Sequence, residues 1–200
     1  MKKHLLVLAI LTAMAFNCLA QTNYNDHSRI SFGFIYGATV GPASNNYTYA
    51  SGFLAKYELP VKSSALSLTL TSGYSFFVPQ TRYTDPAHAP GVVYDNFDYA
   101  HAAFVPVELG ARFYLVKKLY IEGNVGASFN VNSHPQYYTN KTVALLVSPN
   151  LGYAFRFGPS GKVGLDLNLG YEDRFESATT AYRQGSYGRI ALSAALSFGL

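Results

Sequence analysis

The chain has 200 residues, the size of one domain or at most two. Apolar residues make up 49% of it and aromatic residues 16%, whereas charged residues account for only 13%, against the ~25% usual in soluble domains. This composition excludes an intrinsically disordered chain, which needs few apolar and many charged residues. After residue 20 no stretch approaches the ~18 consecutive apolar residues of a membrane-spanning helix, which excludes a helical membrane protein.

The first twenty residues are typical of a secretory signal peptide. Two lysines open the segment, an apolar run covers Leu5–Phe16, and Cys18 and Ala20 are small residues suited to cleavage before Gln21. The alternative is a lipid anchor on Cys18, which the bulky and polar residues directly before it oppose. Cleavage leaves no cysteine for a disulfide, and it leaves thirteen basic and eleven acidic residues. The resulting net charge of +2 gives no indication of nucleic-acid binding.

From about Arg29 onward, apolar residues alternate with small or polar ones in one segment after another. Such alternation is typical of β-strands that have one apolar and one polar face. It predicts an all-β chain of eight strands with no helix. The expected strands span about 29–40, 48–59, 65–78, 100–115, 119–131, 142–157, 162–173 and 187–200.

The connections between the expected strands alternate in length. Tight ones follow the second, fourth and sixth strands, at Pro60–Ser64, Val116–Lys118 and Gly158–Gly161. The longer ones are Gly41–Tyr47, Pro79–Tyr99, Asn132–Lys141 and Arg174–Ser186. This sorting predicts an antiparallel up-and-down barrel of the outer-membrane type, with short periplasmic turns and long extracellular loops. We therefore expect a signal peptide (1–20), a short periplasmic segment (21–28) and a barrel domain (29–200).

The charged residues of the second to eighth strands share the phase of the small and polar residues, so the opposite face is continuously apolar. They are Lys56, Glu58, Glu108, Arg112, Glu122, Arg156, Asp166, Glu172 and Arg189. A soluble barrel would turn the apolar face inward, whereas a membrane barrel turns it outward, because an Arg or Lys facing lipid costs ~2–4 kcal/mol. Strands of ~12 residues exceed the ~5–6 of soluble sheets and suffice to cross a bilayer. With the signal peptide and the loop lengths, this favours the membrane orientation and a polar network in the lumen.

Aromatic residues gather toward both ends of the apolar face. Toward the long loops lie Tyr36, Tyr49, Tyr74, Phe76, Phe129 and Tyr171. Toward the short turns lie Tyr57, Phe113, Phe155, Phe157 and Phe198. Two such belts are expected at the two membrane interfaces, and the alternative is an ordinary aromatic core.

Residues 104–113, 124–129 and 165–171 carry a resemblance to a known family. The chain resembles the small outer-membrane β-barrels of Gram-negative bacteria, the OmpA-, OmpX-, OmpW- and PorT-like eight-stranded proteins, which implies residence in outer-membrane lipid. The last strand is similar to the family's assembly signal, with alternate apolar residues that end in Leu196, Phe198 and Leu200. Many members end in Phe, and this chain ends in Leu. The resemblance implies recognition of this strand by the barrel-assembly machinery.

Two prolines, Pro106 and Pro149, lie inside expected strands. A closed barrel has no edge strand that could spare the hydrogen bond of the missing N–H. We therefore expect a β-bulge at each proline.

The inward charges bear on whether the barrel conducts. An eight-stranded barrel is just wide enough for side chains to fill its interior, and buried charges persist when they are paired. We therefore expect a salt-bridged lumen with no open channel. The alternative is a narrow pore lined by Glu108, Arg112, Glu122 and Arg156, or a carrier of small or apolar solutes, as the OmpW-like resemblance implies.

The sequence offers little for catalysis. A lipid-modifying site needs a nucleophile, a base and a carboxylate close together. His101 is the one suitably placed histidine, and Ala103 occupies the position where a nucleophile would stand on its face. Asp95, Asn96 and Asp98 lack the ligand spacing of a calcium loop. We expect no catalytic residue, no metal and no cofactor.

The longest loop, 79–99, is the most informative segment for function. Its arginine and aromatic residues are candidates for extracellular contacts: Arg82, Tyr83, Tyr94, Phe97 and Tyr99. Such side chains favour contact with protein or glycan, and the alternative is a variable loop without a specific partner. We expect a monomeric barrel with a structural or surface-interaction role, in contact with outer-membrane lipid and with a host or cell-surface ligand, but not with nucleic acid.

Overall fold

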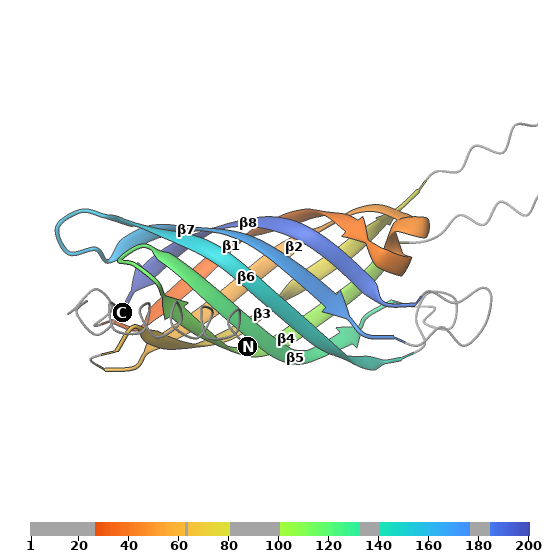
Figure 1. Ribbon diagram of the computed structural model, residues 1–200. Coiled ribbons are helices and arrows are strands. Elements are labelled where there is room, and N and C mark those ends of the chain that lie inside the picture. Colours follow the sequence, from red (N-terminus) through yellow and green to blue (C-terminus); the bar gives the residue numbers. More distant parts are fainter. Residues whose placement is uncertain (1–26, 63, 81–100, 133–140, 177–184) are drawn as a thin grey trace, which may run out of the picture.

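The chain folds into a closed antiparallel barrel of eight strands, as the alternation predicted. The computed structural model describes residues 27–62, 64–80, 101–132, 141–176 and 185–200. Each strand pairs with the next one in sequence, and β8 closes the barrel against β1 (Figure 1). The strands are β1 (Arg29–Val40), β2 (Tyr47–Pro60), β3 (Leu66–Pro79), β4 (Ala102–Tyr114), β5 (Leu119–Asn130), β6 (Val143–Phe157), β7 (Val163–Arg174) and β8 (Tyr187–Gly199).

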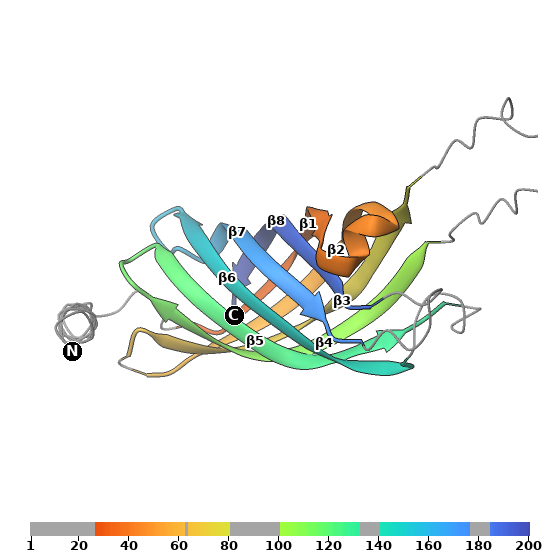
Figure 2. The same ribbon diagram turned by 45° about the vertical axis from the view of Figure 1, so that its right-hand side comes forward.

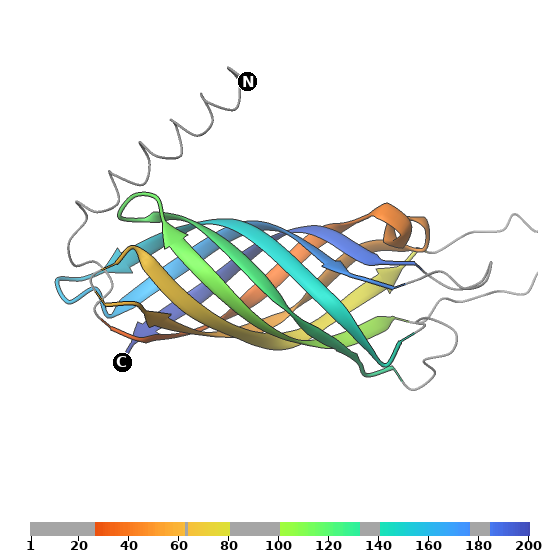
Figure 3. The same cartoon turned by 60° about the horizontal axis from the view of Figure 1, so that its bottom comes forward.

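The two ends of the barrel are built differently. The connections β2–β3, β4–β5 and β6–β7 span only residues 61–65, 115–118 and 158–162, and they lie at one end (Figure 3). The connection from β3 to β4 runs over residues 80–101, whereas that from β1 to β2 takes only residues 41–46. We call these ends the short-turn end and the long-loop end.

The connection from β1 to β2 contains a short helix that the alternation did not predict. It is the 3-10 helix η1 (Gly41–Asn45), which lies at the long-loop end (Figure 2). Pro42 occupies its first turn, where the missing N–H of proline costs nothing, and Gly41 has a positive φ of 62°. Ala43 is fully buried, so the helix turns inward over the mouth of the barrel. Among the described residues, no helix is long and apolar enough to cross a membrane.

The barrel turns its apolar face outward, as expected for the membrane orientation. Phe34, Leu109 and Leu192 are each about two-thirds exposed, at 66%, 65% and 66%. Arg112 and Glu122, by contrast, are 0% and 3% exposed inside the barrel. A soluble barrel would show the opposite distribution, because water favours charged groups on the outer surface and apolar groups in the core.

The expected bulge at Pro106 is absent. β4 pairs with β5 in an unbroken register through Pro106 and Ser128. On the other side, the β3–β4 pairs stop at Ser72 and Val107 and resume in the same register at Ser75 and Phe104. Proline lacks an N–H, so the ladder loses pairs on one side, but no residue is inserted and the register is kept.

The expected bulge at Pro149 is absent for the same reason. Pro149 pairs with Gly123 of β5, while the β6–β7 pairs lapse between Val147 and Asn150 and continue in register. Within the described ladders, the register shift lies instead in β2–β3, between Tyr47 and Tyr49.

Candidate functional site

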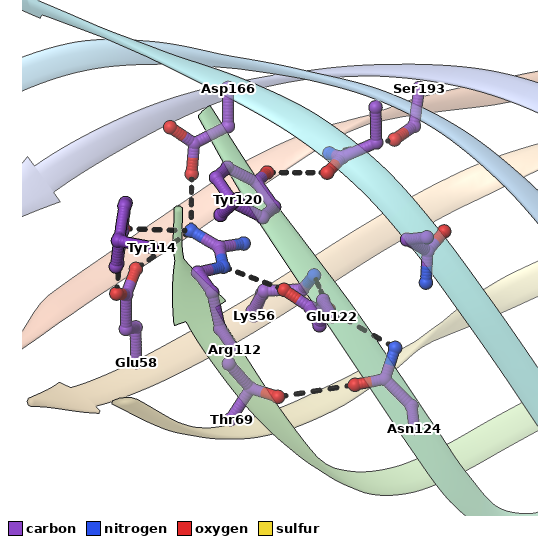
Figure 4. Close-up of polar contacts among 12 residues, drawn as sticks. Lys56, Glu58, Thr69, Arg112, Tyr114, Tyr120, Glu122, Asn124, Asp166 and Ser193 are labelled. Carbon is purple, nitrogen blue, oxygen red and sulfur yellow. Dashed lines mark hydrogen bonds and ion pairs between the residues drawn. The ribbon is translucent and has the colours of Figure 1, made fainter. Parts of the chain in front are cut away.

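The lumen is the site for which the sequence predicted a polar network, and its short-turn half is organised around Arg112 of β4. This side chain is fully buried. Its Nη1 lies 2.9 Å from Oε2 of Glu58 on β2 and 3.2 Å from Oδ2 of Asp166 on β7, and its Nε donates to Oε2 of Glu122 on β5 at 2.7 Å. Figure 4 shows these carboxylates around the guanidinium. One cation thus links four strands.

Two further cations of this half form ion pairs with these carboxylates. Lys56 forms an ion pair with Glu122, and Arg156 contacts Asp166 at 2.6 Å. The structure therefore brings together six of the nine predicted lumen residues. We call this set the arginine network: Lys56, Glu58, Arg112, Glu122, Arg156 and Asp166.

Neutral side chains make further contacts with the arginine network. The Tyr114 hydroxyl donates to Oε1 of Glu58 at 2.9 Å, and Asn124 Nδ2 donates to Oε1 of Glu122 at 3.0 Å. The Arg112 guanidinium lies over the Tyr120 ring in a cation–π contact, with its Cζ 3.8 Å from the centroid of the ring. Sequence reasoning missed these three residues, although each shares the strand phase of a lumen charge two residues away.

The other three predicted lumen residues, Glu108, Glu172 and Arg189, line a central cavity of about 50 Å³. Arg189 Nη2 lies 2.7 Å from Oε2 of Glu172, and Glu108 accepts a hydrogen bond from Ser148. The buried hydroxyl of Thr71, which also lines the cavity, has no hydrogen-bond partner within the protein. A polar cavity of this size has room for on the order of three waters, which would complete these bonds.

An aromatic cluster fills the lumen at the long-loop end. Its members are Tyr47, Phe77, Phe104 and Tyr187. Phe77 meets the other three rings edge-on, and the centroids of Phe104 and Tyr187 are 4.8 Å apart. Ala43 of η1 packs into the same cluster, and the Arg174 guanidinium lies over the Phe104 ring at 4.5 Å.

The aromatic cluster was not predicted from the sequence, because the predicted aromatic belts lie on the outer face. The alternation along each strand could have placed these rings in the lumen, because each ring lies an even number of residues from a polar residue that faces inward. Phe77 shares the phase of Ser75, Phe104 that of Glu108, and Tyr187 that of Arg189.

The lipid-facing surface carries the predicted aromatic residues. Tyr36 and Tyr74 are exposed toward the long-loop end, and Phe157 and Phe198 toward the short-turn end. A groove of about 600 Å³ crosses β1, β2 and β3 on this face, lined by apolar groups that include Phe32 and Phe53. The proposed assembly residues are all exposed on the outside: Leu196, Phe198 and Leu200.

Several predicted features fall outside the described residues. They are the signal peptide (1–20) and the loop candidates Arg82, Tyr83, Tyr94, Phe97 and Tyr99. His101 is described, and it is exposed with its ring 6.5 Å from that of Phe76. Within the described ranges, no group of three or more His, Cys, Asp or Glu residues is arranged to hold a metal.

Neither a protein-family model nor a curated protein sequence matches the chain. Among solved structures, the attachment invasion locus protein Ail of Yersinia pestis is 14% identical, with 86% of this chain and 98% of that one covered and a TM-score of 0.47. Neisserial surface protein A is 13% identical over 86% and 97% of the two chains, with a TM-score of 0.47. The outer-membrane protein AlkL is 12% identical over 90% of each chain, with a TM-score of 0.43.

The geometry of the barrel itself identifies its environment. Eight strands of 12–15 residues close without a free edge, the outer surface is apolar, and the charges are buried in the lumen. A closed barrel has no free strand edge to expose unpaired backbone groups to lipid, and strands of this length suffice to cross a bilayer. Short turns at one end and longer connections at the other are typical of barrels in the outer membrane. The chain is an integral outer-membrane β-barrel of eight strands.

Proposed function

We propose that this barrel is a rigid, non-catalytic scaffold that presents its long loops at the cell surface and conducts no ions. The filled lumen is the observation that supports this proposal most directly. The arginine network fills the short-turn half and the aromatic cluster fills the long-loop end, and only the central cavity of about 50 Å³ lies between them.

The arginine network also argues for rigidity. A buried charge that loses its partner is destabilising by about 3–5 kcal/mol, so each ion pair of the network restrains the strands that carry it. Arg112 lies at the centre, with carboxylates from three other strands in contact with it. A wall held in this way is a firm support for loops, and loops on rigid scaffolds frequently carry binding functions.

The lengths of the connections support a role at the long-loop end. The connection of β3 to β4 covers residues 80–101, whereas the β4–β5 turn covers only 115–118. The long connection contains the candidates Arg82 and Tyr94, and arginine and tyrosine are enriched in protein interfaces.

Conductance in a planar lipid bilayer tests the closed lumen. The purified barrel should insert without giving a stable ion current, while an open porin measured in the same bilayers serves as the positive control. A reproducible single-channel conductance would contradict the proposal and favour the narrow pore lined by Glu108, Arg112, Glu122 and Arg156.

Deletion of residues 80–98 tests the role of the loop. Cells that display the intact barrel should bind proteins or glycans on an array of surface ligands, and cells that display the deletion variant should lose that binding. Heat-dependent electrophoretic mobility verifies that the deletion variant still forms a barrel. Equal binding by both kinds of cell would refute a role for this loop.

A further inference from the structure

The three short turns together carry four lysines and no acidic residue. Lys62 lies in the β2–β3 turn, Lys117 and Lys118 lie in the β4–β5 turn, and Lys162 ends the β6–β7 turn. The turns gather at one end of the barrel (Figure 3). Lys118 is half-buried and the other three lysines are exposed. We call this set the lysine rim.

No carboxylate of the described residues forms an ion pair with the lysine rim. Among the described residues, no member of the rim forms an ion pair, whereas cations of the lumen such as Lys56 and Arg112 do. Glu58, a carboxylate near this end, is buried inside the barrel, where it forms an ion pair with Arg112. The four ammonium groups are therefore available to anions outside the chain.

The position of the lysine rim indicates which anions it meets. Tyr57 and Phe157 are exposed on the outer face of the strands that run into short turns, and Phe198 is exposed at the same end of β8, paired with Val163. Aromatic side chains of this kind lie at the level of the lipid headgroups. Lysines directly beyond them lie next to the phosphate layer, and their long flexible stems let the ammonium groups reach it.

We propose that the lysine rim binds the phosphate groups of anionic phospholipids in the leaflet on the short-turn side. Each lysine close to an anionic membrane surface strengthens the association of a protein with that surface about fivefold. The attraction decays within a Debye length. The interaction should therefore depend on all four lysines and weaken in salt. It would fix how deep the short-turn end sits in the membrane and enrich anionic lipid around it.

Electron paramagnetic resonance of spin-labelled lipids tests this proposal on the whole barrel reconstituted in vesicles. The probes are labelled phosphatidylglycerol and labelled phosphatidylcholine. We expect the barrel to immobilise phosphatidylglycerol several-fold more than phosphatidylcholine in low salt. Replacement of all four lysines, Lys62→Gln, Lys117→Gln, Lys118→Gln and Lys162→Gln, should bring this ratio close to one.

The matched control keeps the charge by changing the same four lysines to arginine, and it should retain the preference. At about 1 M salt the Debye length falls to about 3 Å, so the preference should fade in the unmodified barrel. Equal immobilisation of the two lipids by the unmodified barrel would overturn the proposal, and so would an undiminished preference in the glutamine variant. If the fourfold glutamine variant does not fold, the single variants Lys62→Gln and Lys162→Gln should each show a partial loss.

Discussion

At the level of single residues, Arg112 connects more of the lumen than any other side chain described above. It lies on β4, and its three carboxylate partners lie on β2, β5 and β7. A guanidinium suits this position because it is planar, permanently charged and able to donate in several directions at once. A lysine would supply the charge without the fork of donors. The side chain therefore acts as a cross-link between strands far apart in sequence.

Arg112→Met tests this cross-link, because methionine keeps an unbranched side chain but removes the charge and the donors. It leaves Glu58 without a cationic partner in the network. We expect the free energy of unfolding in phospholipid vesicles, measured by urea titration, to fall by about 3–5 kcal/mol. The control, Ser160→Ala in the exposed β6–β7 turn, should change it by less than about 0.5 kcal/mol. A loss below about 1 kcal/mol for Arg112→Met would show that the network does not hold the strands together.

At the level of the strands, close backbone approach between β1 and β8 depends on glycine. A Cβ added at Gly33 would lie 2.2 Å from the carbonyl oxygen of Ala194 and 2.5 Å from Cα of Ala195. Both are backbone atoms, which cannot rotate away as a flexible side chain can. Gly123 on β5 provides a contrast, because a Cβ there would have no neighbour within 4 Å.

The pair Gly33→Ala and Gly123→Ala tests whether this close approach is needed for closure. We expect Gly33→Ala to lower the free energy of unfolding by about 1–3 kcal/mol, as overpacking does. Gly123→Ala should leave it unchanged or raise it by about 0.4–1 kcal/mol, because the unfolded chain loses freedom. Urea titration gives the energies, and heat-dependent electrophoretic mobility reports barrel closure. Equal effects of the two substitutions would mean that the approach of β1 to β8 is not tight.

At the level of the whole molecule, the membrane orientation predicts that an arginine on the outer face destabilises the barrel more at the middle of the bilayer than near its surface. Leu109 lies within β4 on the outer face, whereas Leu59 lies on the same face next to the end of β2. Leu109→Arg should lower the free energy of unfolding in vesicles by about 2–4 kcal/mol, and Leu59→Arg by about 0–1 kcal/mol. Urea titration of both variants measures the difference. Two small and equal effects would place the outer face in water.

Much of this architecture followed from the sequence because it rests on local rules. Alternation over residues 187–200 predicted β8, which spans Tyr187–Gly199, and the phase of Glu122 and Asp166 predicted that both face the same side as Arg112. The β-bulges predicted at Pro106 and Pro149 were wrong. A missing N–H can be accommodated either by an inserted residue or by a lapse in pairing, and the pattern around Pro106 is compatible with both.

The courses of the strands, the residues that share a face and the apolar character of one face all follow from the order of the amino acids. Three further features become visible when the barrel is closed. Three carboxylates converge on one guanidinium, Phe77, Phe104 and Tyr187 meet inside the barrel, and η1 turns inward over them. The reason is physical. A period of two assigns each side chain to a face from local sterics, whereas neighbours across the lumen depend on how eight strands tilt and stagger when the sheet closes.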